Sequence, residues 1–94
     1  MLAFDWDEQK NESNRKKHGI WFEEAQQVFD DPRGLVFFDE DHSKLEDRFI
    51  LLGISGSARV LVVVFYEKED DDIIRIISAR KATKKEIKRY EEGI

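Results

Sequence analysis

The apolar positions of residues 21–31 follow the spacing of an α-helix. One face of this segment collects four apolar side chains: Phe22, Ala25, Val28 and Phe29. Pro32 follows at once, and proline cannot continue a helix because it lacks a backbone N–H and clashes with the preceding turn. The pattern therefore predicts an amphipathic helix over 21–31 that ends before Pro32.

Beyond Pro32 the pattern changes to short apolar runs rich in β-branched and aromatic residues, which is typical of strands. We predict strands over 35–38, 48–55, 59–67 and 73–80, and a short opening strand over 2–6. The strands over 48–55, 59–67 and 73–80 are joined by links short enough for hairpins, so they should pair antiparallel. The acidic link at 68–72 is interpreted as a charged hairpin tip that limits pairing at the sheet edge.

Capping residues predict a helix near each end of the chain. Asp7 can cap a helix over 8–17, which has almost no apolar stripe, and Gly19 can end it. Thr83 and Glu86 form a capping-box pattern at the start of a helix over 84–92. The fold class is therefore α+β: N-terminal helices and a C-terminal helix packed on a twisted antiparallel sheet, in a single domain over 1–94. The expected core residues are Phe22, Val28, Phe29, Phe49, Leu51, Val62, Val64 and Ile76.

The charge balance counts at first sight against nucleic acid, because the 94 residues include 16 Lys and Arg against 21 Asp and Glu, a net charge of −5. Between Arg75 and Arg89, however, there are seven basic residues and one acid, so a local phosphate-binding surface is possible. The longest apolar run, 60–66, is too short to span a bilayer as a helix, and the first residues lack the order of a signal peptide. We expect a cytoplasmic protein with no membrane contact.

Metal and thiol chemistry find no support in the sequence. There is no cysteine, no His-Glu-x-x-His pair and no cluster of metal ligands, so we expect no metal and no cofactor.

Arginines on predicted strands are the first candidates for chemistry: Arg48, Arg75 and Arg80. A guanidinium in an apolar strand needs either a salt bridge, such as Arg75 with the cross-strand acid Glu67, or a wet groove where it can bind phosphate. Strict alternation points Arg75 and Arg80 to opposite faces, unless a bulge intervenes or Arg80 lies past the sheet.

Two further candidates have simpler structural explanations. His18, at the end of the first helix, could serve only to interact with the helix dipole, and Tyr90 could be a packing residue whose hydroxyl reaches water.

Several motifs resemble the BrnT toxin family. They occur in the family's order over nearly the whole chain, and the most specific are Phe4-Asp5-Trp6-Asp7, Lys17-His18-Gly19-Ile20, Glu46-Asp47-Arg48-Phe49 and Arg75-Ile76-Ile77-Ser78-Ala79-Arg80. One departure is Trp21, where many relatives have a small capping residue. The resemblance implies a RelE-like fold and a type II toxin–antitoxin toxin that cleaves RNA and inhibits translation, on free mRNA or at the ribosome. It also implies a BrnA-like antitoxin partner, through which operator DNA would be contacted only indirectly.

The chemistry expected of such a toxin is metal-independent transesterification, which leaves a 2′,3′-cyclic phosphate. It requires a base, an acid and cations near the phosphate. The candidate cations are Arg48, Arg75 and Arg80; the candidate bases are His18 and Glu46; and the candidate acids are His18, Lys17 and Tyr90. The basic residues of the last helix would follow the RNA backbone: Lys84, Lys85, Lys88 and Arg89. A non-catalytic module that binds RNA, the ribosome or the antitoxin is the alternative.

Overall fold

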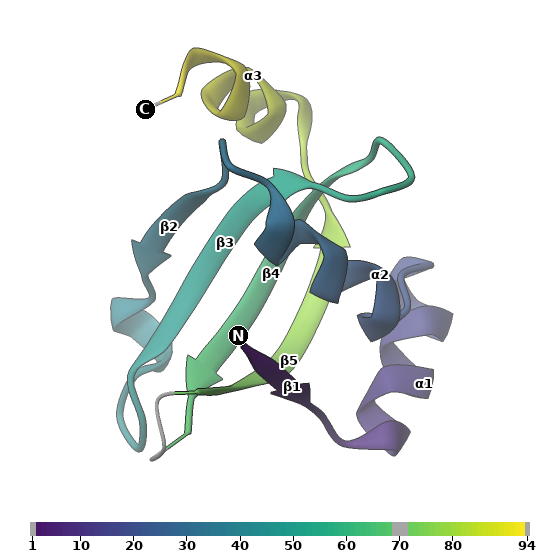
Figure 1. Cartoon of the computed structure of the whole chain (residues 1–94), viewed down its shortest axis with the longest axis vertical. Coiled ribbons are helices and arrows are strands. Elements are labelled where there is room, and N and C mark those ends of the chain that lie inside the picture. Colours follow the sequence, from purple (N-terminus) through teal and green to yellow (C-terminus); the bar gives the residue numbers. More distant parts are fainter. Residues whose placement is uncertain (1, 69–71, 94) are drawn as a thin grey trace.

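The computed structural model describes residues 2–68 and 72–93 and contains one five-stranded sheet (Figure 1). In chain order the elements are β1 (Ala3–Asp5), α1 (Glu8–His18), α2 (Phe22–Gln27), the 3₁₀ turn η1 (Val28–Asp30), β2 (Leu35–Phe38), the 3₁₀ turn η2 (Glu40–His42), β3 (Arg48–Ile54), β4 (Val60–Glu67), β5 (Ile73–Lys81) and α3 (Lys84–Glu92). The predicted elements are confirmed to within two residues, except that the helix over 21–31 is divided into α2 and η1. The interpretation of the acidic link as a hairpin tip concerns residues 69–71, which lie outside the described residues.

The sheet is mixed, so the prediction of an all-antiparallel sheet is wrong. Its strand order is β1-β5-β4-β3-β2, and β2 to β5 form the expected antiparallel meander. β1 instead pairs parallel with β5, with Ala3 opposite Ile73 and Asp5 opposite Arg75. Short links fix the direction of neighbouring strands only, and β1 reaches β5 from the far end of the sequence, so no hairpin constrains it.

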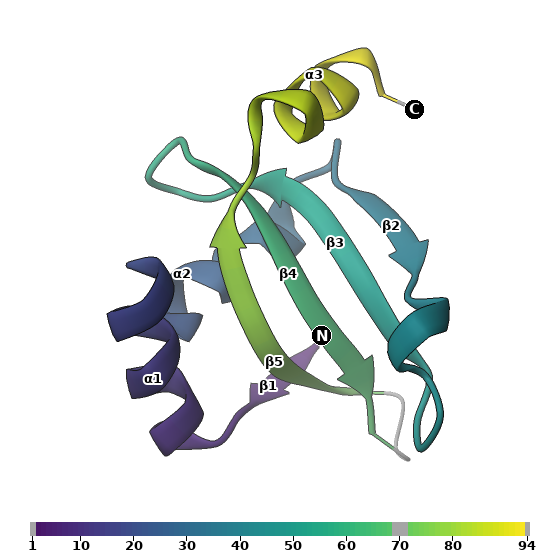
Figure 2. The same cartoon turned by 180° about the vertical axis from the view of Figure 1, so that it is seen from behind.

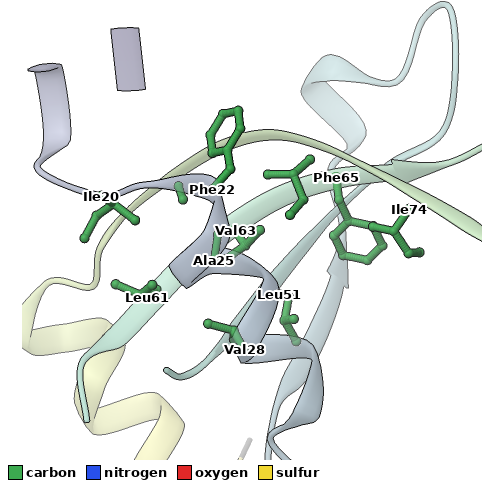
Figure 3. Close-up of a cluster of buried hydrophobic side chains, with 11 residues drawn as sticks. Ile20, Phe22, Ala25, Val28, Leu51, Leu61, Val63, Phe65 and Ile74 are labelled. Atoms are coloured by element: carbon green, nitrogen blue, oxygen red, sulfur yellow. The ribbon is translucent and has the colours of Figure 1, made fainter. Parts of the chain in front are cut away.

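The main hydrophobic core lies between α2 and one face of the sheet (Figure 3). Of the expected core residues, Phe22, Val28, Leu51, Val62 and Ile76 are buried. Phe29 and Phe49 are partly buried against this core. Val62 and Val64 both point to the opposite face of the sheet, where Val62 is buried and Val64 is only half-buried.

Helix α1 begins and ends at the predicted caps, but buried amides attach it to the rest of the protein. Asp7 accepts a hydrogen bond from the backbone N–H of Gln9, and Gly19 has a left-handed φ of 75°. Asn14 Nδ2 donates to the carbonyl of Ala79 at 2.8 Å and its Oδ1 accepts from the Ala79 N–H at 3.1 Å. The side chain thus pairs with the edge of β5 as a neighbouring strand would.

The second buried amide compensates for the missing cap of α2. Trp21 provides no side-chain cap, as the sequence predicts. Asn11, on α1, accepts the Phe22 N–H through its Oδ1 at 2.7 Å and donates to Glu23 at 2.9 Å. A side chain from the preceding helix therefore satisfies the first turn of α2.

Helix α3 lies over one end of the other face of the sheet (Figure 2). Its predicted capping box is present, and Tyr90 packs with Leu52 and Val62 in a second, smaller cluster. Tyr90 is a packing residue, as the sequence allowed, and its hydroxyl has a protein partner: it donates to Asp31 at 2.6 Å. The middle of this face is not covered by α3, and we call it the open face.

Candidate functional site

A β-bulge in β5 places the strand arginines on the same side of the sheet. Arg80 lies opposite Val62 of β4, but the register shifts farther along, so that Arg75 lies opposite Tyr66. Ile77 is the additional residue in β5. Since Val62 and Tyr66 share a face, Arg75 and Arg80 both point to the open face. Strict alternation would have placed the two arginines on opposite faces. The sequence analysis named a bulge as one way to bring them together, and the bulge is confirmed.

The open face contains a cleft of about 590 Å³. Its floor is apolar and includes Ile50, Val62 and Val64. Its polar walls come from α1, from the link between β2 and β3, and from the strands: they include Lys17, His18, Asp39, His42, Arg48 and Arg80. Three separate parts of the chain thus contribute cationic or titratable side chains to one hollow.

The end of α1 brings Lys17 and His18 to the cleft. The Asn14 hydrogen bonds hold this end of the helix beside β5 at Ala79, the residue before Arg80. Lys17 is exposed and His18 is half-buried. The placement depends on a tertiary amide contact, which helical periodicity does not reveal.

The link between β2 and β3 brings Asp39, His42 and Arg48. The Asp39 N–H donates to the Arg48 carbonyl at 2.8 Å, so the two ends of the link are joined. Ser43 Oγ donates to the Asp39 carbonyl at 2.5 Å and accepts from the Arg48 N–H at 2.9 Å. His42 Nδ1 lies 3.1 Å from each carboxylate oxygen of Asp39.

Sequence reasoning did not assign a role to His42 or Asp39. The available signal was the spacing Asp-x-x-His directly after a predicted strand, which places the two side chains one turn apart.

Both cleft arginines are held by carboxylates. Arg80 donates to both carboxylate oxygens of Glu86, at 2.8 and 2.9 Å, and Glu86 also accepts from the Thr83 N–H. The hydrogen bonds from Arg80 lower the pKa of Glu86 to about 2. Arg48 donates to Glu46 at 3.2 and 3.3 Å. The guanidinium orientations are therefore fixed before any ligand binds.

Three of the candidate catalytic residues predicted from the sequence do not line the cleft. Glu46 is connected to it only through Arg48. Arg75 lies toward the other end of β5, and it forms a salt bridge, one of the two alternatives that the sequence left open, with Asp5 at 3.5 Å. Tyr90 is held in its hydrogen bond to Asp31.

The basic residues of α3 flank the site. Lys84, Lys85, Lys88 and Arg89 are all exposed. The Arg89 guanidinium lies 4.2 Å from the centre of the Phe37 ring. A smaller pocket of about 220 Å³ between α3 and the sheet shares Ile50 and Val62 with the cleft, so the hollow surface extends toward α3.

A second hollow of about 440 Å³ lies between α2 and the turn after β3. It contains two carboxylates, Glu23 and Glu24, and Arg59 binds Glu24 and lowers its pKa. An acidic hollow does not suit a phosphate. Within residues 2–68 and 72–93, no three potential metal ligands lie close enough together to hold an ion. No helix of the described chain is long and apolar enough to cross a membrane.

The fold and the cleft define a class of protein: an α+β domain with fixed guanidiniums, two imidazoles and a lysine around a hollow suited to a phosphodiester. A family model described as "Ribonuclease toxin, BrnT, of type II toxin-antitoxin system" matches residues 6–86. The chain belongs to this family, and the resemblance seen in its sequence is confirmed. It is a ribonuclease toxin of a type II toxin–antitoxin system, a class that acts on RNA and has an antitoxin partner.

The structural comparison agrees on the fold. The crystal structure of the Brucella abortus ribonuclease toxin, BrnT, superposes with a TM-score of 0.68 at 24% sequence identity. The match covers 89% of this chain and 100% of the Brucella chain. A search of curated proteins gives no match.

Proposed function

We propose that the protein is a metal-independent endoribonuclease that cleaves RNA by transesterification in the open-face cleft. The observation that supports this most directly is the convergence of Lys17, His18, Arg48 and Arg80 on one hollow. Cleavage of mRNA, free or at the ribosome, would inhibit translation in the cytoplasm. A BrnA-like antitoxin would neutralise the toxin, and operator DNA would be contacted only through that antitoxin.

The reaction needs no water and no cofactor. The ribose 2′-oxygen attacks the adjacent phosphorus and loses its proton to a base, while the bond from phosphorus to the 5′-oxygen breaks. An acid protonates the departing 5′-oxygen. The products are a 2′,3′-cyclic phosphate and a 5′-hydroxyl, so bonds and protons balance.

The guanidiniums of Arg48 and Arg80 suit the charge that develops on the non-bridging phosphate oxygens. The hydrogen bonds of Arg80 to Glu86 and to the Lys81 carbonyl use three of its N–H donors. A guanidinium has five such donors, so two remain for a phosphate oxygen. Glu86 therefore orients Arg80 without saturating it.

Among the predicted proton-transfer groups, His18 lines the cleft, and Lys17 beside it adds positive charge. Arg75, on the same face but farther along β5, is in a position to contact the RNA backbone, as are the basic residues of α3 (Lys84, Lys85, Lys88 and Arg89). These assignments place the reacting phosphate near Arg80 and the rest of the RNA along the open face.

The test is cleavage of a labelled single-stranded RNA of mixed sequence, free or on ribosomes, with excess EDTA. We expect cyclic-phosphate ends, and at least about a 100-fold loss of rate in His18→Ala and Arg80→Gln. Lys10→Gln, on the exposed start of α1, is the control. Loss of wild-type cleavage in EDTA, or 5′-phosphate products, would contradict the scheme.

Cell growth separates this proposal from a non-catalytic binding module. We expect expression to arrest growth, co-expression of a BrnA-like antitoxin to restore it, and His18→Ala to be harmless. Growth arrest by a His18→Ala protein that leaves cellular RNA intact would favour the binding module.

A further inference from the structure

Transesterification requires two proton transfers, and the residues expected from the sequence bring only one imidazole, His18, to the cleft. The structure adds a second imidazole. His42 lines the same cleft from η2, in the link between β2 and β3, whereas His18 comes from the end of α1. The two histidines are thus presented by different parts of the chain.

The contact with Asp39 defines which nitrogen of His42 is available. Nδ1 lies 3.1 Å from both Asp39 carboxylate oxygens, and a carboxylate can only accept. We therefore assign the Nδ1 proton to this contact, which leaves the lone pair of the neutral ring on Nε2. The Asp39 side chain is only 12% exposed and that of His42 is 68% exposed, so a half-buried carboxylate holds an accessible imidazole.

Further hydrogen bonds hold the link between β2 and β3 beside the pair of Asp39 and His42, which we call the dyad. The Ser43 hydroxyl joins the Asp39 carbonyl to the Arg48 N–H, and the Asp39 N–H donates to the Arg48 carbonyl. The dyad and Arg48 are consequently held as one unit at the edge of the cleft. The charged or titratable groups that line the cleft with His42 are Asp39, Asp41 and Arg48 from its own side, and Lys17, His18 and Arg80 from the other elements. An adjoining pocket that His42 also lines adds Lys44 and Glu46.

We propose that His42 is a second catalytic residue for RNA cleavage, with Nε2 accepting the 2′-hydroxyl proton and His18 protonating the 5′-oxygen. Asp39 is a positioning residue that fixes the ring and offsets the positive charge formed when Nε2 takes the proton. His18 suits the acid because it ends α1, where the helix dipole interacts favourably with a protonated ring. This inference rests on the proposed function of the same cleft.

The test is the pH profile of kcat/KM for the same labelled RNA. His42→Ala should lose about 100-fold or more and should lose the acidic limb of the profile, because that limb reports the base that must be unprotonated. Added imidazole should restore part of the rate. Asp39→Asn should lower the rate and displace the limb without removing it.

Glu40→Gln is the matched control, because Glu40 lies on the same 3₁₀ turn, is exposed and does not line the cleft. His42→Asn serves as a second variant, since its amide can still donate to Asp39 but cannot titrate. We expect it to unfold at the wild-type temperature and to cleave as slowly as His42→Ala.

A His42→Asn protein that cleaves at the wild-type rate, or keeps the acidic limb, would overturn the role of His42. If His18→Ala and Arg80→Gln are still impaired in that case, the cleavage site stands and only the second histidine is wrong. If the wild type yields no cyclic phosphate, the proposed function itself fails.

Discussion

At the scale of single residues, a half-buried carboxylate holds distant parts of the chain together. Asp31 accepts hydrogen bonds from the Tyr90 hydroxyl and from the backbone N–H groups of Ile54 and Arg33. Burial alone would raise the pKa of Asp31, but these donors lower it below its usual value. Asp31 therefore remains charged and links β3 and α3 to the corner before β2.

Replacing Tyr90 by phenylalanine tests this link. The change removes the hydroxyl and leaves a partly buried carboxylate oxygen with one donor fewer, so we expect the free energy of unfolding to fall by about 1 kcal/mol. Denaturant unfolding at pH 7 measures it. Tyr66→Phe is the matched control, because the Tyr66 hydroxyl makes no hydrogen bond to any residue that the structure describes. Equal stability of the two variants would contradict the role of the contact.

At the scale of elements, α1 depends on tertiary contacts more than on its own sequence. It has almost no apolar face, and its two buried residues are Asn11 and Asn14. Asn14 satisfies both backbone groups of Ala79 on the edge of β5 that β1 does not reach. The same contact holds the end of α1 that carries His18 beside the cleft.

Asn14→Ala should therefore be strongly destabilising. The substitution leaves the buried N–H and carbonyl of Ala79 unpaired, and we expect a loss of about 2–4 kcal/mol in the free energy of unfolding. Ser13→Ala, on the exposed side of the same helix, should change it by no more than about 0.5 kcal/mol. A small effect of Asn14→Ala would mean that water replaces the amide.

Glu86 makes the stability of α3 depend on pH. Its pKa is lowered to about 2 in the folded protein, from an ordinary value of 4.5. A lowered pKa contributes stability that is present above pH 4.5 and is lost as the pH falls toward 2. Because the ion pair with Arg80 is partly exposed, we expect the contribution to be only about 1 kcal/mol.

Glu86→Gln isolates this contribution, because glutamine can still accept the capping-box hydrogen bond from Thr83. The variant should be less stable than the wild type at pH 7, and the difference should vanish near pH 2. Unfolding curves across this range measure it, with Glu91→Gln, exposed on the same helix, as the control. A difference that persists unchanged at pH 2 would assign the effect to packing.

What the sequence could predict follows the range of the interactions involved. The caps at Asp7 and Thr83 lie within four residues of what they bind, and the helices they define are correct. The parallel pairing of β1, the bulge at Ile77 and the amide of Asn14 depend on partners far away in sequence. The hydrophobic pattern of a segment does not show which distant residues it contacts.

The candidate site shows the same division. Arg48, Arg80, Lys17 and His18 could be selected because their residue types suit phosphate and proton transfer. His42 was not predicted as a site residue, because only the folded link between β2 and β3 brings it to the cleft. Residue type can be read from a sequence, but convergence of loops on one cleft cannot.

At the scale of the whole molecule, the net charge of −5 is an average over regions of opposite sign. The last helix and the strand before it are basic, and α3 lies over one end of the face that contains the cleft (Figure 2). The acidic hollow at α2 lies on the opposite side of the sheet, with the main core. An RNA strand would therefore be attracted to one face of the protein only.

The salt dependence of RNA binding tests this separation of charge. Each phosphate neutralised on a single strand contributes about 0.7 to the slope of log affinity against log salt. Lys84→Gln combined with Lys88→Gln should therefore lower that slope by about 1.4, measured with a non-cleavable 2′-deoxy strand. Lys10→Gln combined with Lys16→Gln changes the net charge equally, but both lysines lie on α1 outside the cleft lining, so the slope should stay nearly constant. If both pairs lower the slope alike, RNA is attracted by the total charge of the protein, and the proposed path along α3 is wrong.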